Sequence, residues 1–237
     1  MPMQRVSAPE LLDSDACSPA ELQIALRDLG RVNRLFGGIS TTRAAIERIA
    51  KRSGQRHFSL LEVAAGLGDV PETAGRDLAR EGIALDVTLL DRAFTHLPRG
   101  KRALVGDALA LPFPDASFDL VNSTLFAHHL EPPVLASFTK EAMRVSRIAL
   151  VINDLVRHPA HIALVYAAFP GFRSRVAWLD GLTSVRRAYT PDEMRKIIAS
   201  AFPATAAPRV EISRNYLFRM GVIVWKNEAV TAPRALP

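Results

Sequence analysis

Cysteine is almost absent from this sequence of 237 residues, where Cys17 stands alone. A single cysteine excludes an internal disulfide, and no cluster of Cys and His with metal-ligand spacing is visible, so no metal site is predicted. No apolar run reaches the roughly 20 residues that a membrane-spanning helix needs. The N-terminus, MPMQRVSAPELLDSDAC, also lacks the basic-then-apolar pattern of a secretion signal. These absences favour a cytoplasmic protein with no membrane span.

Aromatic residues are also few, at 7% of the chain, although the formal net charge is +6. A basic surface is compatible with nucleic-acid binding, but the arginines are scattered and are not interleaved with aromatic side chains on which bases stack. We therefore expect solvated helical faces, and nucleic acid is an unfavoured partner. Hydrophobic residues make up 49% of the chain, enough for one domain with an added cap or lid.

The most informative stretch is FSLLEVAAGLGD, at residues 58–69. Residues 59–63 are mostly apolar and favour a strand buried on both faces. Small residues follow, and after Asp69 and Pro71 the sequence favours a helix. A strand, a turn of small residues and a helix form a nucleotide pocket, because residues without bulk let backbone N–H groups approach a ligand.

The composition of this turn narrows the choice of nucleotide. A dinucleotide site needs G-x-G-x-x-G, but here Pro71 takes the third glycine position and Asp69 brings a carboxylate towards the anion. No Gly-Lys-Ser/Thr follows, which excludes a Walker loop. Glu62, just before the turn, favours a ligand with cationic character.

The chain then alternates between strands and helices. We expect strands at 85–90, 103–106, 120–124 and 148–152, with helices at about 72–81 and 132–147. This alternation predicts a parallel sheet with right-handed crossovers. Two helices precede the first strand: one from Pro19 to about residue 36, and one at 44–50 that Ser40 or Thr41 caps. Residues 1–17 have no periodicity and are expected to be a loose leader.

Three segments resemble class I S-adenosylmethionine-dependent methyltransferases of the type 11, UbiE-like kind. ExAxGxG at 62–68 resembles their first motif, E/D-x-G-x-G-x-G, with Ala64 in place of the first glycine. GDALALPFPDASFD at 106–119 resembles the second half of that core, and EAMRVSR at 141–147 resembles E-x-x-R-V-L-R before the fifth strand. The match spans about residues 56–154. The usual Pro-Gly-Gly turn is missing, since Arg147 runs directly into Ile148.

The resemblance implies an α/β fold: a Rossmann-like, seven-stranded, mainly parallel sheet with an antiparallel last strand, an N-terminal helical cap and a helical lid after strand five. Segments at 210–212 and 217–225 would be the closing pair of strands. The implied organisation is a leader and cap at 1–55, a core at 56–228 with a lid at about 155–190, and a flexible tail at 229–237.

The resemblance also implies S-adenosylmethionine as cofactor and S-adenosylhomocysteine as product. Glu62 and Gly66 would border the methionine moiety, Asp91 would bind the ribose, and Asp107 with Ala108 would hold the adenine edge. An acid at the tip of the second strand is independently placed for ribose hydroxyls. The full set of expected cofactor contacts is Asn33, Arg34, Glu62, Ala64, Gly66, Gly68, Asp91, Arg92, Asp107, Ala108, Leu109 and Ser123.

Acceptor chemistry is expected after strands four and five, because ligands of open α/β sheets bind beyond the carboxyl ends of the strands. Methyl transfer is an in-line displacement that depends on positioning, and a hydroxyl nucleophile also benefits from a base. The candidates for catalysis are His128, His129, Asp154 and His158. Asp154 and His158 equally fit the role of helix caps before Pro159.

The expected acceptor contacts are His128, Asp154, Arg157, Phe169 and Tyr189. An apolar helix at 159–169 indicates either a hydrophobic acceptor cavity or ordinary core. NRLFGG and INDLVRHP resemble bacterial methyltransferases of polyketide and phenolic-lipid pathways, which implies O-methylation of a small phenolic or polyketide-like acceptor.

Several alternatives stay open. C-methylation of a quinone-like ring is the nearest, followed by a non-catalytic S-adenosylmethionine-binding protein and a nucleic-acid-associated protein. An NAD-linked reductase is disfavoured by Pro71 and by the lack of a Tyr-x-x-x-Lys pair. The chain is expected to act as a monomer or homodimer.

Overall fold

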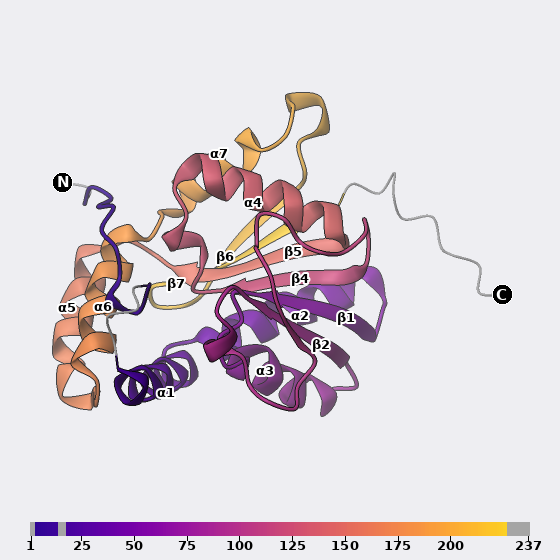
Figure 1. The fold of residues 1–237 in the computed structure, drawn as a ribbon. Helices are drawn as coiled ribbons and strands as arrows, with labels where there is room; N and C mark the ends of the chain where they lie inside the picture. Colours follow the sequence, from indigo (N-terminus) through magenta and orange to yellow (C-terminus); the bar gives the residue numbers. More distant parts are fainter. Residues whose placement is uncertain (1–2, 14–17, 227–237) are drawn as a thin grey trace.

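The computed structural model describes residues 3–13 and 18–226, and its centre is a seven-stranded sheet with the order β3-β2-β1-β4-β5-β7-β6 (Figure 1). β7 is antiparallel to β5 and β6, and the other neighbours pair in parallel. The expected α/β fold is confirmed. The strands are β1 (His57–Val63), β2 (Ala84–Asp91), β3 (Ala103–Val105), β4 (Phe118–Thr124), β5 (Ser146–Leu155), β6 (Val210–Tyr216) and β7 (Arg219–Trp225).

Helices cover both faces of the sheet. Figure 1 shows α2 (Gly38–Ser53) and α3 (Asp69–Ala79) below it, and α4 (Pro132–Val145) and α7 (Pro191–Ser200) above it. Alternate residues of each strand face opposite sides, so β1 contributes to two cores. One core joins Leu60, Ile46 and Leu120; the other joins Leu61, Val121 and Phe138. Both faces of the central strands are therefore buried, as their apolar sequences predict.

A third group of helices lies at the carboxyl ends of the parallel strands: α1 (Pro19–Leu35), α5 (Pro159–Ala167) and α6 (Arg175–Arg187). α1 begins with a capping box in which Ser18 and Glu21 satisfy each other's backbone N–H groups. Asp28 of α1 accepts from the peptide N–H groups of Arg173 and Ser174 at 2.7 and 2.8 Å, where α6 begins. The helical cap and the lid are thus joined.

Residues 3–13, here called the strap, run along this helical layer. The Val6 peptide N–H donates to the Arg186 carbonyl at 3.1 Å, and Asp180 of α6 accepts two strap N–H groups at 2.7 and 2.9 Å. The 3-10 helix η1 (Leu11–Asp13) ends this segment. The expectation of a loose leader is wrong for these residues, because α6 supplies hydrogen-bond partners that sequence pattern does not reveal. The expected tail at 229–237 lies outside the described residues.

Glycines set two helix starts more abruptly than predicted. Neither Ser40 nor Thr41 caps α2; Gly37 does so, with φ 79°, and the helix begins at Gly38. An added Cβ at Gly37 would lie 2.4 Å from the Cβ of Tyr216, so the position needs glycine for its space as well as its conformation. Helix α3 likewise begins at Asp69 directly after Gly68. Each left-handed glycine therefore starts its helix directly, so that no longer loop separates α1 from α2 and only a short turn separates β1 from α3.

Other boundaries also differ from the prediction. α4 ends at Val145 and β5 starts at once, which accounts for the missing Pro-Gly-Gly turn. β6 continues to Tyr216, so the predicted break after residue 212 is wrong. α5 ends at Ala167, and residues 169–171 form a separate 3-10 helix, η4 (Phe169–Gly171). Within the described ranges, no helix combines the length and apolar character of a membrane span.

Candidate active site

The candidate site starts at the carboxyl ends of β1 and β4. Glu62 lies opposite Asn122 in the strand register, and the Asn122 amide donates to Glu62 Oε2 at 2.5 Å. Glu62 is only 1% exposed. Burial raises the pKa of Glu62 to about 7, against the lowering effect of hydrogen bonds from Asn122 and Thr124. Glu62 is therefore a carboxyl group poised to change its charge near neutral pH.

The turn after β1 is left-handed at three small residues: Ala64, Gly66 and Gly68, with φ of 55°, 51° and 72°. A Cβ at Gly68 would lie 2.6 Å from Leu89 Cδ1, whereas one at Gly66 would meet nothing within 4 Å. Gly68 is thus needed for packing and Gly66 faces open space. Ala64 adopts a conformation that costs an L-residue about 1–2 kcal/mol, at the position where the family motif has glycine.

Asp91, at the tip of β2, holds this turn. Its Oδ2 accepts from the Gly66 N–H and its Oδ1 from the Ala93 N–H, both at 2.9 Å. Burial opposes ionisation, but these bonds and the nearby His96 keep the pKa of Asp91 below its usual value. Each carboxylate oxygen has a second lone pair, so an ionised Asp91 can still accept from ligand hydroxyls. Arg92, the next residue, is exposed.

The third part of this edge follows β3. Asp107 is exposed, and its Oδ1 accepts from the Leu109 N–H at 2.9 Å in a tight turn. Ala108 is half-buried between these two residues. The turn of Asp107 and Ala108 thus follows β3, where the family resemblance implies a contact with adenine.

Arg144 of α4 anchors the loop that continues from this turn. Its guanidinium donates to the carbonyls of Leu111 at 3.1 Å and Phe113 at 2.9 Å, and pairs with Asp115 at 2.7 Å. Glu141 accepts from the Leu111 N–H at 2.8 Å. Two of the segments that carry the family resemblance therefore bind each other directly.

His128 and Asp154 form a buried pair beyond β4 and β5, at 2% and 1% exposure. His128 Nδ1 lies 2.7 Å from Asp154 Oδ1, and the His128 peptide N–H donates to Asp154 Oδ2 at 3.0 Å. Asp154 also accepts from the Leu155 N–H at 2.7 Å. This is an imidazole oriented by a carboxylate. Asp154 does not cap α5, because His158 is the N-cap of that helix.

The strap brings Glu10 to the other side of the same imidazole. Glu10 is 6% exposed; its Oε1 lies 3.4 Å from His128 Nε2, and its Oε2 lies 3.7 Å from His129 Nε2. Ser184 donates to Glu10 Oε1 at 2.8 Å. Although burial disfavours the charged ring, Asp154 and Glu10 raise the pKa of His128 to about 9. Glu10 was not predicted, because it lies in a segment without periodicity.

Other predicted residues have structural partners. His158 is exposed, caps α5 by accepting from the Ala160 N–H at 3.1 Å, and stacks on Phe218 with ring centroids 5.2 Å apart. The capping interpretation therefore fits His158. Phe169 is 46% exposed, with its ring against Trp178 at 4.7 Å.

Arg157 and Tyr189 also act within the fold. The three guanidinium nitrogens of Arg157 donate to the Met3 carbonyl at 2.7 Å, the Ala188 carbonyl at 2.6 Å and Glu193 Oε1 at 2.5 Å. The Tyr189 hydroxyl donates to a carbonyl, that of Leu130, at 2.6 Å. Arg157 thus connects the strap with α7, and neither side chain is directed at an acceptor by these contacts.

Asn33 supports a buried cation. Its Oδ1 accepts from Arg219 Nη2 at 2.8 Å, and Arg219 is 1% exposed and also approaches Asn153 Oδ1 at 3.4 Å. Burial lowers the pKa of Arg219 to about 10. Sequence reasoning missed Arg219, although an arginine opening an apolar strand was a visible signal. The side-chain oxygen of Asn33, which was predicted to contact the cofactor, therefore binds Arg219 in this structure.

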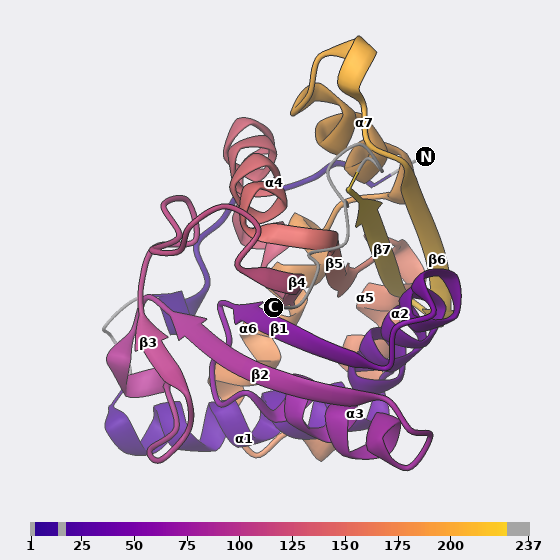
Figure 2. The same ribbon diagram turned by 90° about the vertical axis from the view of Figure 1, so that its right-hand side faces the viewer.

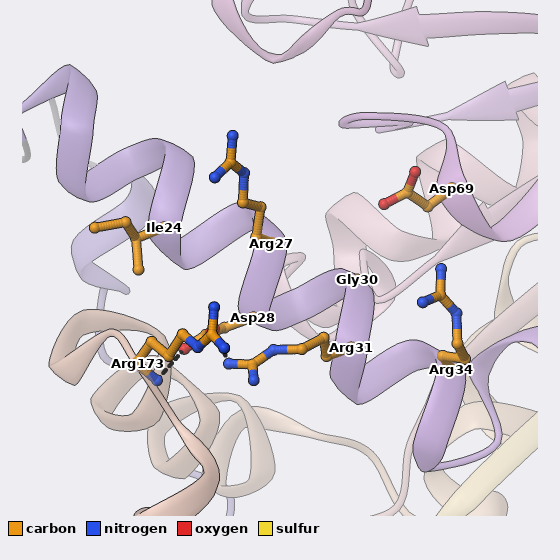
Figure 3. Close-up of a pocket in the computed structure, with 8 residues that line it drawn as sticks. All are labelled: Ile24, Arg27, Asp28, Gly30, Arg31, Arg34, Asp69 and Arg173. Atoms are coloured by element: carbon orange, nitrogen blue, oxygen red, sulfur yellow. Dashed lines mark hydrogen bonds and ion pairs between the residues drawn. The ribbon is translucent and has the colours of Figure 1, made fainter.

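Arg34 instead lines a cavity of about 340 Å³ between α1 and the start of α3 (Figure 3). Figure 3 shows Arg27, Arg34 and the Asp69 carboxylate on the same side of α1. Gly30 lets the helix approach, since a Cβ there would lie 2.8 Å from Asp69 Oδ2. The lining residues are Ile24, Arg27, Asp28, Gly30, Arg31, Arg34, Asp69 and Arg173.

A smaller cavity, of about 60 Å³, lies between α1, α5 and the β6–β7 turn, beside Leu155. Figure 2 is turned by 90° from Figure 1, so that the side opposite α1, α5 and α6 faces the viewer, and it shows the β6–β7 edge of the sheet at the right. Apart from His161 and Arg219, the residues that line this cavity are apolar or aromatic: Val32, Phe36, Leu155, Leu164, Val165, Ala168, Phe172, Tyr216, Leu217 and Phe218.

Comparison with known proteins agrees with this architecture. The family model described as "Methyltransferase domain" matches residues 61–148. Demethylmenaquinone methyltransferases from Beutenbergia cavernae and Renibacterium salmoninarum are 34% and 35% identical over 111 residues, which is 44% of this chain and 42% of each relative. The matched segment therefore spans less than half of either curated relative.

Solved structures show the same fold at low identity. The plantazolicin methyltransferase BpumL has a TM-score of 0.64 at 13% identity, covering 91% of this chain and 93% of that one. Human N-acetylserotonin methyltransferase has a TM-score of 0.60 at 13% identity, covering 87% and 56%, and a methyltransferase from Aquifex aeolicus has 0.56 at 16%, covering 88% and 98%. The chain therefore has the seven-stranded methyltransferase fold that its motifs predicted, and its residues 61–148 match the family model of a methyltransferase domain.

Proposed function

We propose that this protein transfers a methyl group from S-adenosylmethionine to a small acceptor. The observation that carries the proposal is the set of groups at one edge of the sheet: a left-handed turn of small residues between Glu62 and Asp91. When bound, the cofactor supplies an electrophilic methyl group on a positively charged sulfur. The two carboxyl groups suit a cationic ligand with ribose hydroxyls.

Unpaired polar atoms at the same edge support a ligand there. Among the described residues, Ser123 Oγ and Asn122 Oδ1 are buried without a hydrogen-bond partner. Successive strand residues face opposite sides of the sheet, so the two atoms point to different faces. Because buried polar groups are nearly always paired, the unpaired oxygen of Asn122, beside Glu62, favours a bound polar molecule there. We assign Asp91 to the ribose, Asp107 with Ala108 to the adenine edge, and Arg34 in its basic cavity to the cofactor carboxylate.

We assign His128 the role of activating the nucleophilic group of the acceptor, and Asp154 the role of positioning the His128 ring. Asp154 fixes the imidazole through the 2.7 Å contact at Nδ1, which leaves Nε2 for chemistry. Because Asp154 and Glu10 raise the pKa of His128 to about 9, Nε2 takes the acceptor's proton only when the ring is neutral, and transfer by this route should become faster as the pH rises towards 9. Burial of the pair excludes water, and the parallel strands fix where the acceptor can approach.

For the acceptor we favour O-methylation of a small, hydrophobic phenolic or polyketide-like molecule. The cavity beside Leu155, at about 60 Å³, is too small to hold such a molecule without movement of its walls, and its support for a hydrophobic acceptor is the apolar character of its lining. C-methylation of a quinone-like ring is the second candidate, favoured by the similarity to relatives named demethylmenaquinone methyltransferases. The two reactions differ in whether the acceptor loses a hydroxyl proton or a ring proton.

Calorimetry tests the cofactor first. We expect S-adenosylmethionine and S-adenosylhomocysteine to bind one per chain and NADH not to bind. Methyl-labelled cofactor is then offered with phenols, polyketides, quinones and fatty acids, and the product is examined by mass spectrometry and NMR to locate the new methyl group. Binding of NADH without binding of S-adenosylmethionine overturns the proposal.

A further inference from the structure

We propose that Glu10, His128 and His129 form a binding site for one divalent transition-metal ion of the zinc class. The ligands come from two segments: Glu10 from the strap, and the two histidines from the 3-10 helix η3 (Ala127–His129). Their potential ligand atoms all lie within 4.8 Å of one another. The site would therefore connect the strap to the catalytic edge of the sheet.

The distances suit a metal ion. Glu10 lies 3.4 Å from His128 Nε2 through one oxygen and 3.7 Å from His129 Nε2 through the other. Ligand bonds of about 2.0–2.2 Å in tetrahedral zinc sites place neighbouring ligand atoms roughly 3.3–3.5 Å apart. The two distances from Glu10 to the histidines are thus within a few tenths of an ångström of this spacing, and the three ligand atoms, one from each residue, lie within 4.8 Å of one another. The imidazole rings are already neighbours, with centroids 4.3 Å apart.

A second, independent observation is the state of the His128 ring. Its Nε2 is buried and, among the described residues, makes no hydrogen bond. Its Nδ1 faces Asp154 Oδ1 at 2.7 Å, and the Asp154 carboxylate is held by two peptide N–H groups. A histidine that binds a metal through one nitrogen typically donates the other N–H to a carboxylate. His128 has this arrangement, with Nε2 directed towards Glu10, and metal binding would displace the Nε2 proton.

The outer contacts of Glu10 complete the arrangement. Ser184 Oγ donates to Oε1 at 2.8 Å, which orients the carboxylate towards the two imidazoles. Glu10 is 6% exposed and the His129 side chain 22%, so the cluster is enclosed but has an approach past His129. Two imidazoles and one carboxylate favour zinc or cobalt over magnesium or calcium, which prefer oxygen ligands.

Three protein ligands leave one coordination position open. A water molecule would take it in the resting protein. Resting on the proposed function, the acceptor oxygen could replace this water, and the metal would lower the pKa of the acceptor hydroxyl, whose proton would pass to solvent past His129. The oxygen would then form its bond to the methyl carbon as the carbon–sulfur bond breaks and its electron pair stays on sulfur. The metal site itself does not depend on that step, because its binding can be measured without either substrate.

Cobalt titration of the chelator-treated full-length protein tests the proposal. We expect one Co²⁺ per chain with the visible absorption bands of tetrahedral cobalt, displaced by Zn²⁺. Glu10→Gln keeps the size of the side chain and its contact with Ser184, and should abolish the bands. Asp154→Asn should weaken binding by about 10- to 100-fold, the usual effect of losing a carboxylate behind a ligating histidine. His57→Ala is the matched control, since His57 is an exposed histidine beside Asp86, and should leave binding unchanged.

A second readout follows the strap directly. Zn²⁺ should slow hydrogen–deuterium exchange at the peptide groups of residues 5–12 in the wild type and not in Glu10→Gln. Absence of stoichiometric binding, or equal binding by wild type and Glu10→Gln, overturns the proposal and leaves a metal-free ion pair between strap and η3. S-adenosylmethionine affinity, measured in parallel with and without metal, reports on the proposed function separately.

Discussion

Asn122 donates a hydrogen bond of 2.5 Å to Glu62, and the two side chains lie side by side in the register of β4 and β1. The carboxyl group of Glu62 is almost completely buried, so its protonation state is coupled to folding. This relationship leads to the first prediction.

Wild-type stability should fall between pH 5 and pH 8 relative to Glu62→Gln. The folded pKa of Glu62 is raised to about 7, above its ordinary value of 4.5. A raised pKa means that the folded state binds the proton more tightly, so the stabilisation is complete below pH 4.5 and is lost as the pH rises through 7. We expect a difference of about 1–3 kcal/mol, since one pKa unit corresponds to about 1.4 kcal/mol. Urea unfolding at both pH values measures it; parallel pH profiles for both proteins contradict it.

Asp91→Ala should weaken S-adenosylmethionine binding by about tenfold or more. The substitution removes the proposed ribose acceptor and the partner of the Gly66 N–H, and one lost charged hydrogen bond is worth about 1.5–3 kcal/mol. Calorimetry measures the change. Asp86→Ala, an exposed acid on the same strand, is the control and should bind normally. Unchanged affinity in Asp91→Ala would remove the ribose assignment.

Ala64→Gly should leave stability unchanged or increase it by up to about 1 kcal/mol. Ala64 has φ 55°, where glycine carries no steric penalty, and this gain offsets the greater chain entropy of glycine in the unfolded state. Ala163→Gly, at an exposed position within α5, should instead cost about 0.5–1 kcal/mol. Thermal unfolding compares them. Equal losses in the two variants would show that Ala64 is not strained.

Arg144→Ala should destabilise the fold by about 1–3 kcal/mol, because carbonyls at Leu111 and Phe113 lose a charged donor. Arg144→Lys should recover little, since an ammonium cannot reproduce the forked geometry that reaches both carbonyls and Glu141. The unfolding midpoint in urea gives the energies, and cofactor affinity reports on the Asp107 turn that this loop continues. Full stability in Arg144→Lys would contradict the geometric argument.

His128→Ala should lower kcat by about a hundredfold or more while the affinity for S-adenosylmethionine stays within about twofold. His158→Ala, a variant of a helix-capping histidine, should retain most of its activity. Single-turnover assays with saturating cofactor separate the chemical step from binding. Full turnover in His128→Ala would mean that alignment alone supports transfer.

The core could be read from sequence because its signals are local. Strand, small-residue turn and helix follow each other within residues 58–79, Asp91 ends β2, and Asp107 lies just after β3. Gly68 was identifiable from the ExAxGxG pattern, and the structure adds that only a residue without a side chain clears Leu89. Local pattern therefore predicted the sheet and the turns at the carboxyl ends of its strands.

The acceptor side depends on contacts between distant residues, which local pattern does not encode. Glu10 reaches His128, and Asn33 reaches Arg219, only after the whole chain has folded. Arg157 was predicted to face an acceptor because it follows a strand tip, but its donors bind the carbonyls of Met3 and Ala188 and the carboxylate of Glu193. Periodicity assigns a residue to an element, and the partner that satisfies its polar atoms comes from tertiary packing.

The strap has a consequence for the order in which the molecule is assembled. Its residues precede β1 in the chain, yet their hydrogen-bond partners at Asp180 and Arg186 are synthesised only after β5 and α5. Contacts between such distant residues form late, because closing a long loop costs entropy before any bond repays it. The five parallel strands β1 to β5 can thus pair while Glu10 is still in solvent, and the strap can close over the helical layer only after α6 has been made.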